Sequence, residues 1–247
     1  MMRKLGVAVL LAVLVGVAPF CVAEDGVTRD EKAIEVLKSM SEYLGSLDTF
    51  EITGTAMEDA DLGEGLIVTN PTEVKVRVVR PGSFHMRQFD GEQTKDFFIH
   101  DGGLALYDAR TGFYATASVP EGLDAGFDFA LDELGINLPL MDLVRSDVFD
   151  GLVQPSDSLM YLRNKNRVDG QDCHHLVIRT NGADIQLWVQ EGKQPVPRRM
   201  IITSNWDAGS PRFYAIMNWN ADPKIEAGAF KFKAPKGASL IQFEPAN

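Results

Sequence analysis

The run Asp172-Cys173-His174-His175 carries four adjacent side chains of the kinds that bind metal ions or act as nucleophiles. It lies in a segment that alternates apolar and polar residues, a pattern typical of a β-strand. Adjacent side chains of a strand point to opposite faces, so His174 and His175 cannot both turn toward one ion. His85 and His100 lie in other predicted strands, without HxH or HxxxH spacing. One buried and one exposed histidine is therefore the favoured interpretation, and no metal site is expected.

Recognisable catalytic signatures are absent from the sequence. A nucleophilic Cys173 would need a nearby base and an electropositive setting, and this stretch belongs to an acidic chain. The GxSxG elbow of serine hydrolases does not occur, nor do the GxxxxGK[ST] and GxGxxG motifs of nucleotide-binding loops. Paired carboxylates for glycoside chemistry stay open, because 35 acidic residues allow many pairings. We therefore predict no catalytic residue, no enzymatic activity and no cofactor.

Two further groups of residues could bind a ligand. Asp59, Asp61 and Glu64 form the densest acidic cluster, but the DxDxDG order of a calcium loop is missing, so a solvated loop is favoured. Several large aromatic residues fall on predicted strands, where core packing or cross-strand pairing is the usual role and a ligand-lining face is the alternative. These aromatic residues are Tyr107, Tyr114, Trp188, Tyr214 and Trp219.

The N-terminus has the features of an export signal. Arg3 and Lys4 precede an apolar segment from Leu5 to Val17, which is shorter than the roughly 20 residues of a membrane-spanning helix. Cys21-Val22-Ala23 supplies small residues for a signal peptidase, so cleavage after Ala23 is expected. Lipidation of Cys21 is less favoured because Phe20 precedes it, and an uncleaved anchor is the third reading. We expect a periplasmic protein whose residues 1–23 are a signal peptide.

Composition limits the partners of the remaining chain. The 24 basic and 35 acidic residues give a net charge of −11, which repels phosphate backbones and anionic lipid head groups, so nucleic acid is not an expected partner. Residues 24–247 suit a single domain and contain no second segment apolar enough to span a membrane. Cys173 would be the one remaining cysteine, which excludes an internal disulfide. A monomer is expected.

The order of elements is predicted from periodicity. Thr28, with Glu31 three residues later, is the expected N-cap of an amphipathic helix that runs to Leu47. Short alternating runs follow, with tight turns at Asp101-Gly102-Gly103 and Thr111-Gly112, a pattern typical of an antiparallel meander. We expect a mainly β (α+β) fold.

The middle of the chain interrupts this meander. From Glu121 to Phe149 the apolar spacing becomes helical, which predicts two short helices hinged at Asn137-Leu138-Pro139. Strands are expected to resume after Pro155 and to continue to the end of the chain. The apolar stripe of such an insert must be buried, so the insert should lie across a face or a mouth of the sheet.

Several stretches resemble a known family. DGQDCHHLVIRTNGADIQLWVQEGKQPVPRRMIIT contains HL-x(7)-D-x-Q-x-W and P-x-P-R-[RK] elements, and YLGSLDTFEITG, FFIHDGGLALYDARTGFYAT and FKFKAPKGASLIQF extend the likeness over nearly the whole mature chain. They resemble the predicted periplasmic proteins of domain of unknown function 2092. That family is more distantly similar to periplasmic lipoprotein carriers of the LolA type. The resemblance implies a strongly curved, unclosed antiparallel β-barrel of about 10–11 strands, with an N-terminal helix and a helical lid at about 121–149. The basic residue that holds the lid closed in those carriers has no counterpart that we assign from the sequence.

Two functions follow as hypotheses. The first is a soluble periplasmic binding or carrier protein for a hydrophobic ligand, such as a lipid or a lipoprotein acyl chain. The second is a non-enzymatic interaction or sensor module that binds an envelope protein partner. For the first hypothesis, the expected ligand-binding residues lie on the apolar faces of the strands and on the lid. They are Leu104, Leu106, Phe127, Leu131, Leu187, Phe213 and Met217.

We predict that Val9→Asp blocks export. A charge at the centre of the apolar segment opposes membrane insertion by about 2.5–3.5 kcal/mol. Cell fractionation and immunoblotting should then find the precursor in the cytoplasm. Normal accumulation of processed protein in the periplasm would disprove the signal assignment.

Overall fold

The computed structural model of the 247-residue chain describes residues 28–136, 140–206, 209–226 and 228–244. The expected signal peptide and the expected hinge at Asn137-Leu138-Pro139 lie outside the described residues. Among the helices that are described, none combines the length and the apolar character that a bilayer crossing requires.

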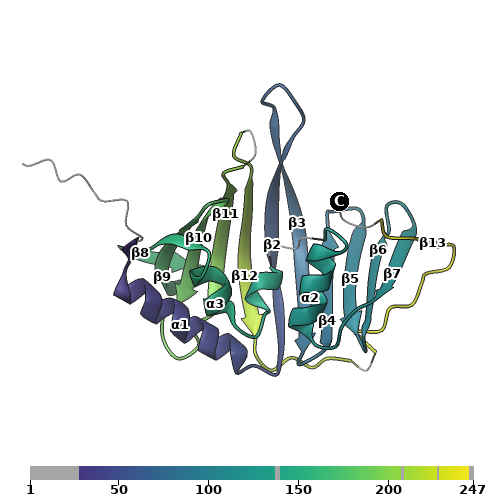
Figure 1. The fold of residues 1–247 in the computed structure, drawn as a ribbon, viewed down its shortest axis with the longest axis horizontal. Helices are drawn as coiled ribbons and strands as arrows, with labels where there is room; N and C mark the ends of the chain where they lie inside the picture. The colour runs from purple at the N-terminus through teal and green to yellow at the C-terminus, as the bar shows by residue number, and fades with distance from the viewer. Residues whose placement is uncertain (1–27, 137–139, 207–208, 227, 245–247) are drawn as a thin grey trace, which may run out of the picture.

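One open sheet dominates the fold (Figure 1). Within the described residues it has 13 strands in the order β1-β8-β9-β10-β11-β12-β2-β3-β4-β5-β6-β7-β13, and two different strands form its edges. The strands are β1 (Thr28–Arg29), β2 (Thr49–Asp61), β3 (Ile67–Val79), β4 (Ser83–Phe89), β5 (Thr94–His100), β6 (Gly103–Asp108), β7 (Phe113–Ser118), β8 (Ser156–Val168), β9 (Gln171–Thr180), β10 (Ala183–Gln190), β11 (Pro197–Ser204), β12 (Arg212–Asn220) and β13 (Ser239–Ile241).

Strand alternation divides the sheet into two chemically different faces. Val74, Val76 and Val78 of β3 are buried on one face, which we call the inner face, and their cross-strand neighbours on β4 include Phe84 and Met86. The residues between them, such as Arg77, point to the opposite, outer face. All the helices lie across the inner face (Figure 1). The main core of the protein therefore lies between the helices and this face.

The N-terminal helix α1 (Glu31–Gly45) begins two residues later than the sequence indicated. Asp30 is its N-cap, and its carboxylate accepts a hydrogen bond from the backbone N–H of Lys32 at 2.8 Å. Thr28 is not the cap, because it pairs with Ser158 in the short parallel strand β1. The predicted apolar stripe is confirmed, and its members Leu37, Met40 and Leu44 are fully buried.

The predicted helical interruption is present as three short helices rather than two. They are α2 (Leu123–Asp132), the 3-10 helix η1 (Met141–Leu143) and α3 (Val148–Val153). We call α2 together with residues 140–146 the covering segment. Phe127 of α2 packs edge-on against Phe84 of β4, with ring centroids 5.1 Å apart, which anchors α2 to the inner face.

The end of the chain differs from the prediction. In the described part of the chain, residues 221–226 and 228–238 are largely irregular, and one short strand, β13, follows, paired in parallel with β7. The predicted mainly β fold with one unclosed sheet is confirmed, but its strand number is higher than the expected 10–11. Without the two short parallel strands at the edges, β1 and β13, 11 strands remain, which agrees with the expected number.

We predict that Gly54→Ala weakens the pairing of β2 with β12. A Cβ atom on Gly54 would lie 1.9 Å from the carbonyl oxygen of Ile216, which is backbone and cannot move independently. The free energy of unfolding should fall by more than about 2 kcal/mol in urea titrations. Gly151→Ala is the control: within the described structure its Cβ would meet no atom within 4 Å, so stability should be unchanged or slightly higher. Equal stability of both variants would contradict the close approach of the two strands.

Candidate functional site

The expected ligand-binding residues mostly gather on the inner face. Leu104, Phe127, Leu187 and Met217 are buried in the main core, and Leu106 and Phe213 are partly buried against it. Leu131 differs, because its side chain is 43% exposed and lies on the outward side of α2. The expectation that Leu131 shares the covered stripe is therefore wrong.

The interface between the covering segment and the sheet is tightly packed. One apolar gap there is lined by residues that include Ile52, Leu140 and Met217, and it has no room for a water molecule. At this gap the covering segment packs directly against the inner face. An apolar ligand could reach it only if the covering segment moved.

One partly buried arginine joins the covering segment to the sheet. Arg80, directly after β3, donates hydrogen bonds from Nη2 to the carbonyl oxygens of Val144 at 2.7 Å and Arg145 at 3.2 Å. Its Nε donates to the carbonyl oxygen of Leu47, just after α1, at 3.2 Å. The guanidinium also lies over the ring of Phe50, 5.6 Å from its centroid. Arg80 thus connects the sheet, the end of α1 and the covering segment.

The electrostatic setting of Arg80 makes this connection sensitive to substitution. Burial lowers the pKa of Arg80, while Asp124 and Asp48 act in the opposite direction. Its hydrogen-bond acceptors are neutral carbonyls, so the bonds depend on the fork of the guanidinium and not on an ion pair. A cleft of about 330 Å³, lined in part by Arg80, Pro81 and Gly122, opens beside it where α2 begins.

The chemically interesting run in β9 has a structural role. His174 bonds to Tyr161 Oη at 3.0 Å, whereas His175 stacks on Trp188 and bonds to Gln186 on the outer face. The two histidines therefore lie on opposite faces, as predicted. Burial raises the pKa of the Cys173 thiol, the reverse of what a nucleophile needs. In the part of the chain that the structure describes, no three His, Cys, Asp or Glu side chains gather as a metal site would require.

The acidic cluster stabilises the long β2–β3 hairpin. Asp59 accepts hydrogen bonds from Thr69 Oγ1 at 2.6 Å and from the Arg212 backbone N–H at 3.2 Å. Asp61 accepts one from the backbone N–H of Gly63, whereas Glu64 is exposed at the turn. The first two carboxylates are thus used within the hairpin and, for Asp59, in its contact with β12.

The aromatic residues do not line a single face. Trp219 packs on the inner face, stacked 5.5 Å from Phe50. The others face outward. Trp188 and Tyr214 flank Arg199. Tyr107 and Tyr114 lie beside Phe232 of residues 221–226 and 228–238, which we call the C-terminal segment.

A comparison with protein families supports the resemblance seen in the sequence. Residues 33–244 match the model of the predicted periplasmic protein family DUF2092. The chain belongs to this family. No curated protein matches this DUF2092 protein.

Solved structures with similar architecture are remote in sequence. The Mycobacterium tuberculosis lipoprotein LppX is 10% identical, with a TM-score of 0.47, over 80% of this chain and 100% of that one. LprF from Mycobacterium bovis is 13% identical, with a TM-score of 0.47, over 81% and 98%. A LolA superfamily protein from Nitrosomonas europaea is 11% identical, with a TM-score of 0.39, over 81% and 97%. None of these similarities indicates what the DUF2092 protein binds.

Arg80 is the residue that sequence reasoning missed. Its one local signal is the sequence Arg80-Pro81-Gly82 after a buried strand, which marks a turn but not a long-range contact. The carbonyl acceptors belong to segments 33 and 64–65 residues away, so no motif spacing could connect them.

We predict that Arg80→Gln loosens the covering segment while the sheet stays folded. Loss of the charged donor should lower the free energy of unfolding by about 2 kcal/mol and raise local opening ten- to a hundredfold. Hydrogen exchange should speed up at the amides of Leu143 and Val144, which bond within η1. Arg110→Gln, which removes an exposed ion pair with Asp90, is the matched control. Unchanged protection in Arg80→Gln would show that packing alone holds the segment.

Proposed function

We propose that this DUF2092 protein is a non-enzymatic periplasmic carrier that holds an apolar ligand, such as a lipid or a lipoprotein acyl chain, under the covering segment. In this proposal residues 1–23 are removed on export, residues 24–247 form one domain, and the covering segment opens as a lid. The observation that carries it is the Arg80 contact. Arg80 helps to fasten the segment over an apolar sheet face, and its release together with displacement of the packed lid side chains would expose that face without breaking strand pairs.

The proposed ligand surface consists of residues on the inner face and on the lid that belong to the main core or pack against it. They are Leu104, Leu106, Leu187, Phe213 and Met217 on the sheet and Phe127 on the lid. The carrier needs no cofactor, since binding rests on burial of apolar area.

The free energies of burial support a reversible exchange between the lid side chains and a ligand. Burial of an acyl chain of about ten methylenes would contribute roughly 8 kcal/mol at about 0.8 kcal/mol for each. The lid side chains it would displace, Phe127, Leu140 and Leu143, contribute about 1.5–3 kcal/mol each. Because the two are of the same order, the hydrogen bonds of Arg80 are large enough to shift the balance between open and closed forms.

A second candidate is an interaction module that binds an envelope protein. The β2–β3 hairpin extends beyond its neighbouring strands (Figure 1), and Leu62 and Leu66 at its tip are 67% and 59% exposed. Acidic residues such as Glu58 and Glu64 surround the tip, which suits a partner with an apolar patch and a basic rim. Deletion of the tip would abolish this function and leave lipid binding intact.

We predict saturable binding of the fluorescent fatty acid 11-(dansylamino)undecanoic acid. Arg80→Gln should take up the probe about tenfold faster in stopped-flow fluorescence, because its lid opens more often. Leu131→Ser, on helix α2 of the lid, is the control. Its rate of probe uptake should match that of the wild type because Leu131 is already exposed. Absence of saturable fluorescence with both wild type and Arg80→Gln would refute the carrier proposal.

A further inference from the structure

Basic side chains gather around one pocket on the outer face, although the protein as a whole is acidic. Arg77 and Arg87 project from β3 and β4, while Lys231 and Lys233 come from the C-terminal segment that crosses this face. Together they line a hollow of about 480 Å³. The chain carries a net charge of −11, so four cationic groups around one pocket are a local reversal of its charge.

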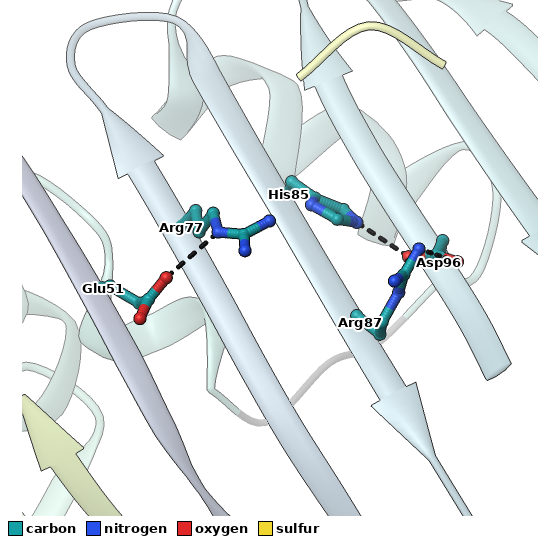
Figure 2. Close-up of polar contacts among 5 residues, drawn as sticks. All are labelled: Glu51, Arg77, His85, Arg87 and Asp96. Atoms are coloured by element: carbon teal, nitrogen blue, oxygen red, sulfur yellow. Dashed lines mark hydrogen bonds and ion pairs between the residues drawn. The ribbon is translucent and has the colours of Figure 1, made fainter. Parts of the chain in front are cut away.

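The one carboxylate that lines this pocket is already paired (Figure 2). Asp96 Oδ1 lies 2.7 Å from His85 Nε2 and accepts a hydrogen bond from Arg87 Nε at 2.7 Å, and Arg87 Nη2 donates to Oδ2 at 3.2 Å. Burial opposes ionisation of Asp96, but the contacts from His85 and Arg87 hold its pKa below the ordinary value. Asp96 therefore stays ionised near neutral pH and does not neutralise Arg77 or the two lysines.

Two residues that line the pocket have polar atoms without a hydrogen-bond partner in the described structure. The His85 side chain is only 6% exposed, and its buried Nδ1 atom has no hydrogen-bond partner among the described residues. Figure 2 shows the Arg77 guanidinium turned toward His85, while its Nε bonds to Glu51 at 3.0 Å. Within the described structure Arg77 uses only Nε, so its Nη atoms remain available. The Nη atoms of Arg77 can therefore donate hydrogen bonds to an anion in the pocket.

Aromatic rings form the rest of the wall. Phe98 stacks on His85 with centroids 4.2 Å apart and an interplanar angle of 4°. Phe232 lies between the two lysines in the sequence. Its ring centroid is 5.6 Å from that of Phe98 and 6.2 Å from that of Tyr107. This packing fixes the C-terminal segment on the sheet and holds Lys231 and Lys233 at the mouth of the pocket.

We propose that this pocket binds a small organic anion, a phosphate or carboxylate attached to an apolar or planar body. Arg77, Lys231 and Lys233 would bind the oxyanion, and Arg77 suits the bidentate geometry of phosphate and carboxylate. Phe98, Tyr107 and Phe232 would contact the body. The site lies on the sheet face opposite the lid and does not depend on the carrier proposal.

The test is isothermal titration calorimetry of the full mature protein with phenyl phosphate and with inorganic phosphate, at about 0.15 M salt to screen weak surface attraction. Phenyl phosphate should bind more tightly than inorganic phosphate, because the ring adds aromatic contacts. Lys231→Gln combined with Lys233→Gln should weaken binding about tenfold or more. Both lysines are exposed, so this variant should fold normally. Lys224→Gln combined with Lys236→Gln is the control, since both residues are exposed on the same segment but outside the pocket.

A sedimentation arm with phosphatidylglycerol vesicles distinguishes the source of the anion. Binding to phenyl phosphate but not to vesicles would identify the ligand as a free small molecule. Vesicle binding that the Lys231/Lys233 variant loses would identify it as a lipid head group. Either result supports the site. Equal binding by wild type and the Lys231/Lys233 variant would overturn the proposal. An equal loss in the control variant would also overturn it, because general charge would then explain the binding. So would absence of binding to either phosphate and to vesicles.

Discussion

A continuous apolar sheet face that must be kept from water is the constraint on which the rest of this structure depends. Strand alternation places Val76, Ile99, Leu104 and Leu187 on the same face, across strands that lie far apart in the sheet. An open sheet of this size cannot bury that face against itself, so other elements must cover it. Helix α1 and α3 cover the part near β8, and α2 covers the part near β4 and β5 (Figure 1).

The two covers differ in how they are attached. Helix α1 presents a fully buried stripe that includes Leu37 and Met40, so it is a permanent part of the core. The covering segment also packs tightly, but Arg80 adds a polar fastening that a single side chain controls. Hydrogen bonds of that kind contribute about 2 kcal/mol, which is enough to change the population of a local open state ten- to a hundredfold. A carrier would need this combination of a stable sheet and a releasable cover.

Much of the fold could be predicted from the sequence because it follows from periodicity. The stripe of α1, the alternation of β3 and the change to helical spacing at Glu121 are local patterns, and each corresponds to an observed element. The parallel edge strands could not be predicted, since two or three residues such as Thr28–Arg29 have no period. Thr28 and Asp30 are both good N-caps, and only tertiary pairing decides between them. By its spacing Leu131 fits the apolar stripe of α2 that includes Phe127. In the structure, however, α2 buries Phe127 and leaves Leu131 exposed.

The sites were less predictable than the fold because they depend on contacts between distant segments. The outer-face positions of alternating strands commonly carry charged residues, so charged residues there give no sign of a site in the sequence. Those positions hold Arg77, His85, Arg87 and Asp96. Their significance comes from the C-terminal segment, whose Phe230 and Phe232 alternate like a strand but pack against the outer face.

The most direct test of the carrier account is native mass spectrometry of the protein purified from its own periplasm without detergent. The account predicts a fraction of molecules with an added mass that organic extraction removes and that lipid analysis identifies as an acyl-containing compound. A protein that shows only its own mass, in every preparation and also as Arg80→Gln, would contradict it.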